Sequence, residues 1–95
     1  MRSSSRHSSR LGAAQEVAIG AASAASAAFG AQTYQVLVAA TSACRTRIGD
    51  GTPAALATDS YLPADRPEYF TCTPGQKIAV IQEAAGGKLS VTEVA

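Results

Sequence analysis

The side chains that could carry chemistry in this sequence are few, and most stand alone. The single histidine, His7, lies in the N-terminal segment MRSSSRHSSR. A catalytic triad, a cysteine–histidine pair or a histidine metal site needs an ordered imidazole beside its partners. No such partner accompanies His7 in the sequence, so we expect this side chain to be solvated.

The remaining polar motifs do not indicate catalysis either. The seven acidic residues are scattered, mostly in turn-like sequence, and no pair of carboxylates is predicted to share a cleft. The stretch IGDGTP lacks the GK[ST] ending of a phosphate-binding loop and does not open a helix. The sequence therefore predicts no enzyme, no cofactor, no metal site and no small-molecule substrate.

The two cysteines, Cys44 and Cys72, are expected on the same face of the strands that carry them. Two thiols cannot complete a tetrahedral zinc site without other ligands. They could touch, either as a pair of buried free thiols or as a disulfide, and we favour the free thiols.

The first twelve residues are predicted to be a flexible basic arm. Ser and Arg alone cannot bury enough surface to order a segment. The arm carries Arg2, Arg6 and Arg10 and no acid, whereas the rest of the chain is close to neutral. Arginines among serines can contact phosphates, but no aromatic residue is interleaved for stacking on bases. We therefore favour a protein partner for the arm over nucleic acid.

An Ala-rich lead-in follows over residues 13–32. Within it, residues 15–19 are predicted to form a short strand that places Val17 and Ile19 on one face. Residues 20–32 are then a tightly packed connection of small side chains. A helix over residues 21–29 is the alternative, because alanine favours helices.

From residue 33 onward, apolar residues alternate with polar ones between Pro/Gly turns, which indicates strands. Pro74-Gly75 predicts a hairpin between residues 67–73 and 76–82. Residues 13–95 are therefore predicted to form one all-β domain, a small sandwich or barrel of six to seven strands. Tyr34 is expected on the inward face with the first residues of the predicted core, which comprises Val36, Val38, Ile48, Phe70, Ile78, Val80, Leu89 and Val91.

The loop over residues 51–67 is longer than a hairpin connection needs, and it holds Leu56, Tyr61 and Leu62. We interpret these three side chains as partner contacts. In the alternative interpretation, Tyr61 and Leu62 close one end of the core.

The predicted core is thin, since 21 residues are alanine and only seventeen are Val, Ile, Leu or Phe. A large apolar side chain stabilises a fold by roughly 1.5–3 kcal/mol when buried. We therefore expect the chain to form a homo-oligomer or to dock on a larger surface. No uninterrupted run of about 18 apolar residues indicates a membrane span.

From Phe29 onward the chain resembles small proteins encoded among the head and tail structural genes of tailed bacteriophages. The resemblance rests on an apolar strand, a Cys-containing strand ending in IG, TDSYLPA and PEYF, PGQKIAVIQ, and a terminal GGKLSVTE. It implies a virion structural protein made in the bacterial cytoplasm, most plainly a capsid cement (decoration) protein. Such proteins are β-rich, oligomeric and bound to the major capsid protein lattice at the capsid surface. The Arg/Ser arm departs from the family pattern.

Two other functions stay open at this point. One is a tail or fibre accessory module that binds the host, for which the chain offers Tyr34, Tyr61 and Tyr69 but no tryptophan. The other is a nucleic-acid binder that acts through the arm.

Overall fold

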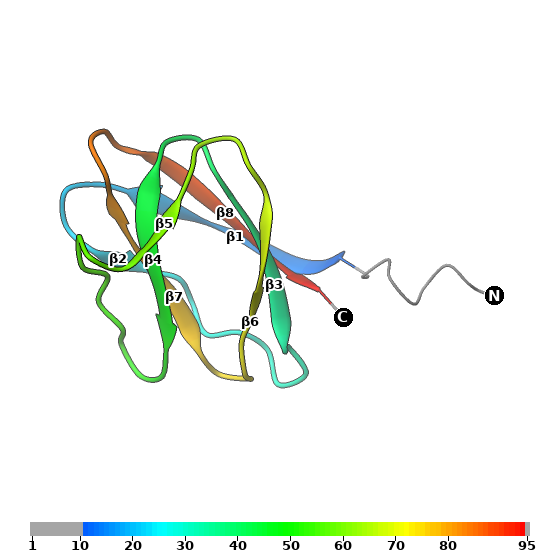
Figure 1. Ribbon diagram of the computed structural model, residues 1–95. Coiled ribbons are helices and arrows are strands. Elements are labelled where there is room, and N and C mark those ends of the chain that lie inside the picture. The colour runs from blue at the N-terminus through cyan, green and yellow to red at the C-terminus, as the bar shows by residue number, and fades with distance from the viewer. Residues whose placement is uncertain (1–10, 95) are drawn as a thin grey trace.

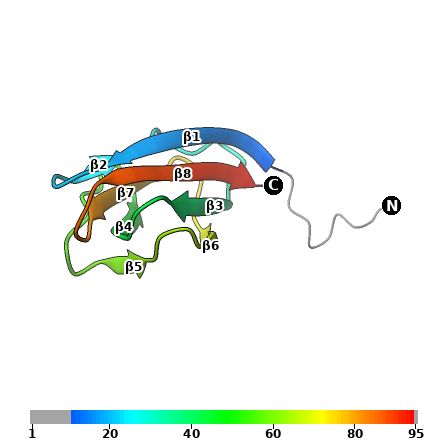
Figure 2. The same ribbon diagram turned by 90° about the horizontal axis from the view of Figure 1, so that it is seen from above.

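The computed structural model describes residues 11–94, which form two four-stranded antiparallel sheets (Figure 1). Sheet A has the strand order β1-β8-β3-β6, and sheet B has the order β2-β7-β4-β5. The two sheets form the layers of a sandwich (Figure 2), so the all-β prediction is confirmed, with eight strands instead of six or seven. The strands are β1 (Leu11–Ile19), β2 (Ala24–Ala25), β3 (Gln35–Ala40), β4 (Cys44–Gly49), β5 (Ser60–Leu62), β6 (Glu68–Thr71), β7 (Lys77–Gln82) and β8 (Gly87–Val94).

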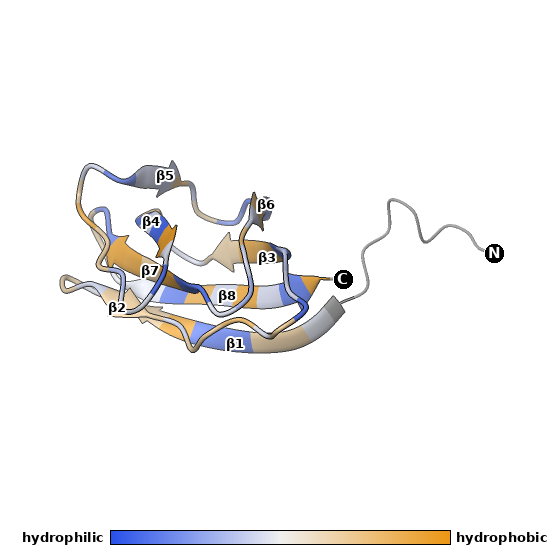
Figure 3. Cartoon of the chain, turned by 90° about the horizontal axis from the view of Figure 1, so that it is seen from below, coloured by the Kyte–Doolittle hydropathy of each residue, from blue (hydrophilic) through white to orange (hydrophobic). Residues whose placement is uncertain are grey.

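The core lies between the sheets and follows from the period-two pattern. Successive side chains of a strand point to opposite faces, so every second residue is buried. Figure 3 shows this as alternating colours along β8, whereas β7 is apolar along much of its length. Six of the predicted core residues are fully buried, while Ile48 and Phe70 are half-buried and pack against the core. The buried six are Val36, Val38, Ile78, Val80, Leu89 and Val91.

The sequence predicts Tyr34 on the inward face of β3, but its side chain is 61% exposed. The strand begins at Gln35, and the chain before it turns through a hydrogen bond from the Thr33 N–H to the Gly30 carbonyl. Because the alternation ends where the turn begins, Thr33 is buried in place of Tyr34.

The predicted hairpin at Pro74-Gly75 is wrong. β6 pairs with β3 in sheet A, whereas β7 lies between β2 and β4 in sheet B. Gly75 has a φ of 84°, as the third residue of a type II turn requires. Such a turn does not match the twist of a two-residue hairpin. The chain therefore crosses from one sheet to the other at this point.

The N-terminal prediction needs one correction, and the helix that was its alternative is excluded. β1 begins at Leu11, four residues earlier than expected, so residues 11 and 12 belong to the strand and not to the arm. Residues 21–29 form no helix, because the main chain here pairs with β7. Ser26 donates its N–H to the Ile78 carbonyl, and its hydroxyl accepts the Ile78 N–H. Residues 1–10 lie outside the described part of the chain.

The connection between β4 and β5 folds back over the outer face of sheet B. Ala55 is buried and donates its N–H to the Ser23 hydroxyl, beside β2. Ala79 points outward from the middle of the sheet by its register with Arg47, yet it is 0% exposed. The small alanine side chains let the connection pack closely on the sheet.

Both cysteines are buried and free, as predicted, but they do not meet. The Cys72 N–H bonds to the Tyr34 carbonyl at the start of β3, whereas Cys44 follows the turn at the end of β3. Six strand residues span roughly 20 Å. Burial raises the pKa of the Cys44 thiol to about 11, and that of Cys72 is raised by burial and by the nearby Glu93 carboxylate.

Candidate functional site

One side of the sandwich is closed by hydrogen bonds. The Gln15 side chain, on β1, bonds to both the N–H and the carbonyl of Ala27. The Glu93 carboxylate, on β8, accepts hydrogen bonds from the Gly30 N–H and the Thr33 hydroxyl. These contacts fasten the segment around β2 to sheet A, so the two layers do not separate there.

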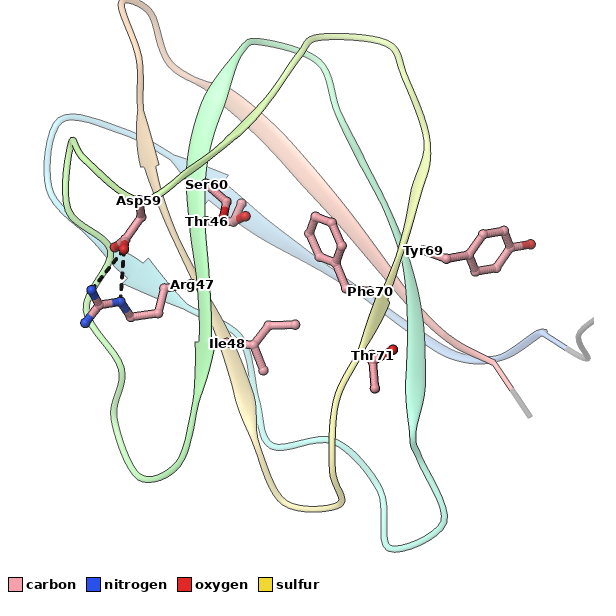
Figure 4. Close-up of a pocket in the computed structure, with 8 residues that line it drawn as sticks. All are labelled: Thr46, Arg47, Ile48, Asp59, Ser60, Tyr69, Phe70 and Thr71. Carbon is pink, nitrogen blue, oxygen red and sulfur yellow. Dashed lines mark hydrogen bonds and ion pairs between the residues drawn. The ribbon is translucent and has the colours of Figure 1, made fainter.

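The opposite side is open, because its edge strands β5 and β6 are short. A groove of about 430 Å³ lies between them (Figure 4). Ligand pockets in proteins have volumes of this order. The lining residues come from β4, β6, the start of β5 and the residue before it, and they are Thr46, Arg47, Ile48, Asp59, Ser60, Tyr69, Phe70 and Thr71.

One wall of the groove is the free edge of β6. In an antiparallel pair, alternate residues exchange hydrogen bonds with the neighbouring strand. The bond from the Cys72 N–H to the Tyr34 carbonyl fixes this alternation, so the main chain of Phe70 faces β3. The N–H and C=O groups of Tyr69 and Thr71 consequently point away from β3 and toward the open side.

The facing wall is the second half of β4. The bond from the Glu83 N–H to the Ala43 carbonyl fixes the alternation between β4 and β7. By that alternation, the Ile48 main chain faces the β5 side. Within residues 11–94, β5 pairs with Cys44–Thr46 alone, so no described strand lies beside Ile48 there. Two unpaired main-chain edges therefore border one groove.

The side chains between these edges are apolar at the centre. Phe70 and Ile48 point toward each other across the groove, while the Tyr69 side chain points away (Figure 4). Thr46, beside them, is only 4% exposed, and its hydroxyl has no hydrogen-bond partner within residues 11–94. A buried hydroxyl without a partner costs about 1–3 kcal/mol. The groove thus presents apolar surface together with an unused donor and acceptor.

An ion pair between Arg47 and Asp59 lies beside the groove, on the other side of β4 from Phe70 and Ile48 (Figure 4). Asp59 accepts hydrogen bonds from the Arg47 guanidinium, 2.9 Å away at the nearest, and from the Leu56 N–H at 2.7 Å. These bonds, the Leu56 N–H first, hold the pKa of the Asp59 carboxyl below its usual value. The carboxylate therefore fastens the β4–β5 connection to β4.

This geometry predicts how the connection responds to acid. The pKa of Asp59 is lower in the folded protein than in the unfolded chain. Its stabilisation of the β4–β5 connection is therefore complete above the ordinary aspartate pKa, near 3.8, and is lost as the pH falls through the lowered value. We expect the hydrogen-exchange protection factor of the Leu56 amide to stay constant above about pH 5 and to fall below about pH 4. Asp59→Asn should remove most of this pH dependence, whereas an unchanged profile in the variant would contradict the assignment.

The structure separates the three contact residues that the sequence suggested in the loop. Leu62 is 1% exposed and belongs to the core, which corrects its assignment as a surface contact and agrees with the alternative that it closes the core. Tyr61 is 52% exposed, and the guanidinium carbon of Arg45 lies 4.9 Å from the centre of the Tyr61 ring. Leu56 is equally exposed. Arg2, Arg6 and Arg10 lie outside the described residues.

The sequence did not indicate the groove. Asp59 and Ser60 belong to the 51–67 loop, which the sequence suggested as a partner contact, whereas the other lining residues belong to predicted strands and Ile48 and Phe70 to the predicted core. Alternation shows which face a residue occupies but not how far its strand is covered. The one signal was the Pro-rich stretch PADRP, which keeps β5 short.

Comparison with known proteins returned no matching family model, no matching curated protein and no matching solved structure. Within residues 11–94, no helix is long and apolar enough to cross a membrane. The same residues contain no group of three His, Cys, Asp or Glu side chains placed to hold a metal ion.

Proposed function

We propose that this protein is a non-enzymatic virion structural subunit, a cement protein that binds and stabilises a major capsid protein lattice. The observation that carries the proposal is the open side of the sandwich, where two unpaired strand edges border an apolar groove. Exposed strand edges are templates for pairing with another chain, and natural proteins usually block them. An exposed strand edge beside an apolar groove therefore favours a surface that binds protein.

The composition of the core supports the same proposal. The core cluster contains five valines and only two leucines, Leu62 and Leu89, so each buried side chain contributes modestly. Association with other subunits adds buried surface to such a domain. The resemblance to small phage structural proteins supplies the identity of the partner, and a homo-oligomer on the capsid surface is part of this proposal.

The direct test is the protein content of purified particles. We expect mass spectrometry of virions from the phage that encodes this chain to find it in many copies per particle, in a fixed ratio to the major capsid protein. Particles lacking the gene should lose heat stability and regain it when purified protein is added. Absence from intact particles would overturn the proposal, and presence only in isolated tails would favour the tail-accessory alternative.

The basic arm gives a separate prediction. Deletion should remove residues 2–10 and stop there, because β1 begins at Leu11. We expect this deletion to weaken attachment to particles and to leave the melting temperature of the free protein within about 2 °C, since a ΔΔG near zero shifts it little. Cosedimentation with particles at low and moderate salt measures the first, and calorimetry the second. Equal attachment at both salt concentrations would show that the arm is not an anchor.

A further inference from the structure

We infer that the groove between β4 and β6 is a strand-acceptor site. In this arrangement an extended segment of a partner protein adds to β6 as a new edge strand of sheet A. The segment inserts one apolar side chain between Phe70 and Ile48. This deepens the proposed function by naming the site and the form of the partner segment, and it rests on that function only for the source of the segment.

The main chain of β6 provides the hydrogen bonds that strand addition needs. The N–H and C=O groups of Tyr69 and Thr71 already point into open space at the edge of the sheet. Peptides that extend a sheet gain affinity from such main-chain bonds and specificity from pockets for alternate side chains. The gap between Phe70 and Ile48 is a pocket of that kind, in line with the sheet (Figure 4).

The buried hydroxyl of Thr46 is an independent indication of a ligand. It lies in the groove wall at 4% exposure without a hydrogen-bond partner in residues 11–94. Buried polar groups in native proteins are nearly always paired. A polar main-chain or side-chain group of the inserted segment would supply the missing partner.

Charges in the groove and on the edge strand β6 beside it specify the segment further. Arg47 is paired with Asp59, so these two lining residues add no net charge to the groove. Glu68, at the start of β6, is exposed and forms no ion pair within residues 11–94. The geometry therefore favours a segment that is uncharged and apolar in the middle and carries a basic residue opposite Glu68.

An edge strand of a second copy fits this groove less well than a free extended segment. The groove is bounded on one side by sheet A and on the other by β4 and β5, so it admits a single layer. The other free edge of sheet A is β1, whose inward side chains Val17 and Ile19 are already covered by their own sheet B. The β1 edge of a second copy would therefore bring sheet B with it. A free extended segment has no second sheet packed against it, so it can enter the groove alone.

The experiment supplies a donor strand from the chain itself. Val94, Gln35 and Thr71 lie in one row across sheet A, which places the C-terminus two strands from Thr71, about 10 Å away. A Gly/Ser linker of about twelve residues spans this distance and raises the effective concentration to the millimolar range. The tail then continues with a strand of alternating Val and Thr that ends in Lys, antiparallel to β6. The control tail is Gly/Ser throughout.

The readout is amide hydrogen exchange at residue resolution. We expect the Tyr69 and Thr71 amides to exchange at least tenfold more slowly with the Val/Thr tail than with the control tail. Equal rates, or protection at Ala14, Glu16 and Ala18 on β1 instead, would overturn the inference. Concentration-dependent protection of Tyr69 in the protein without a tail would assign the groove to a second copy and would equally overturn it.

Proline substitutions give the matched variants. Thr71→Pro removes an N–H that bonds to nothing inside the sheet, and proline is tolerated at such edge positions. In the tailed protein we expect Thr71→Pro to abolish protection of the Tyr69 amide and Tyr69→Pro to abolish protection of the Thr71 amide. Either variant is sufficient if the other fails to fold. Ala18→Pro makes the same change on the free edge of β1 and should leave the protection intact.

The two proposals can fail separately. If the tail protects β6 but virions lack the protein, the strand-acceptor site stands and the cement function does not. If Thr71→Pro still attaches to particles as tightly as the wild type, the cement function stands and the groove is not the surface that binds the particle.

Discussion

Leu62→Asp is expected to unfold the protein. Leu62 is 1% exposed and is among the largest fully buried side chains. Removing the leucine side chain alone costs about 2–5 kcal/mol. An unpaired buried carboxylate adds a penalty of about 3–5 kcal/mol, or its pKa rises until it is neutral. Because domains are stable by only about 5–15 kcal/mol, little folded protein should remain.

The control for this substitution is the neighbouring residue. Tyr61→Asp introduces the same side chain at a position that is 52% exposed and next to Arg45, so the fold should be retained. Denaturant titrations followed by far-UV circular dichroism compare the two variants, and Leu62→Ala provides an intermediate loss. A cooperative, near-wild-type transition for Leu62→Asp would remove Leu62 from the core and restore it as a surface contact.

The strands of this protein could be predicted from its sequence because each strand carries its own pattern. Val36 and Val38, or Leu89 and Val91, are read correctly without knowing which strand lies beside them. The pairing of strands could not be predicted in this way. Consecutive strands lie in opposite sheets except β4 and β5, so proximity along the chain is a poor guide to neighbours. The Pro74-Gly75 turn illustrates this, since it crosses between sheets.

The candidate site could not be predicted for the same reason, since it depends on which strands are neighbours. Phe70 and Ile48 have the side chains of core residues, and only the lengths of β5 and β6 leave them half-covered. Strand length at an edge is decided by where turns such as the one at Asp65 begin, with its positive φ of 59° and its N–H bonded to Ala40. Local sequence does not show which neighbouring strand is left without a partner as a result.

The contact between two turns at one end of the sandwich provides the second large effect. The connection before β8 packs against the connection before β4, where the Ser42 hydroxyl donates to the Gly86 carbonyl and the Lys88 N–H donates to the Thr41 hydroxyl. Gly87 lies between these bonds. A Cβ added there would lie 2.5 Å from the Thr41 hydroxyl oxygen and 2.7 Å from that of Ser42, well inside van der Waals contact.

Gly87→Ala is therefore expected to lower the free energy of unfolding by roughly 1–3 kcal/mol, because both hydroxyls must move and their hydrogen bonds weaken. Gly20→Ala is the matched control: its added Cβ meets nothing within 4 Å, so it should be neutral or stabilising by up to about 1 kcal/mol through the unfolded chain. Urea titrations of both variants measure the difference. Since glycine and alanine differ by one methyl group, a loss in Gly87→Ala alone isolates the packing of the two turns. Equal stability of the two variants would mean that the turns separate without cost and that this end of the sandwich is not fastened by them.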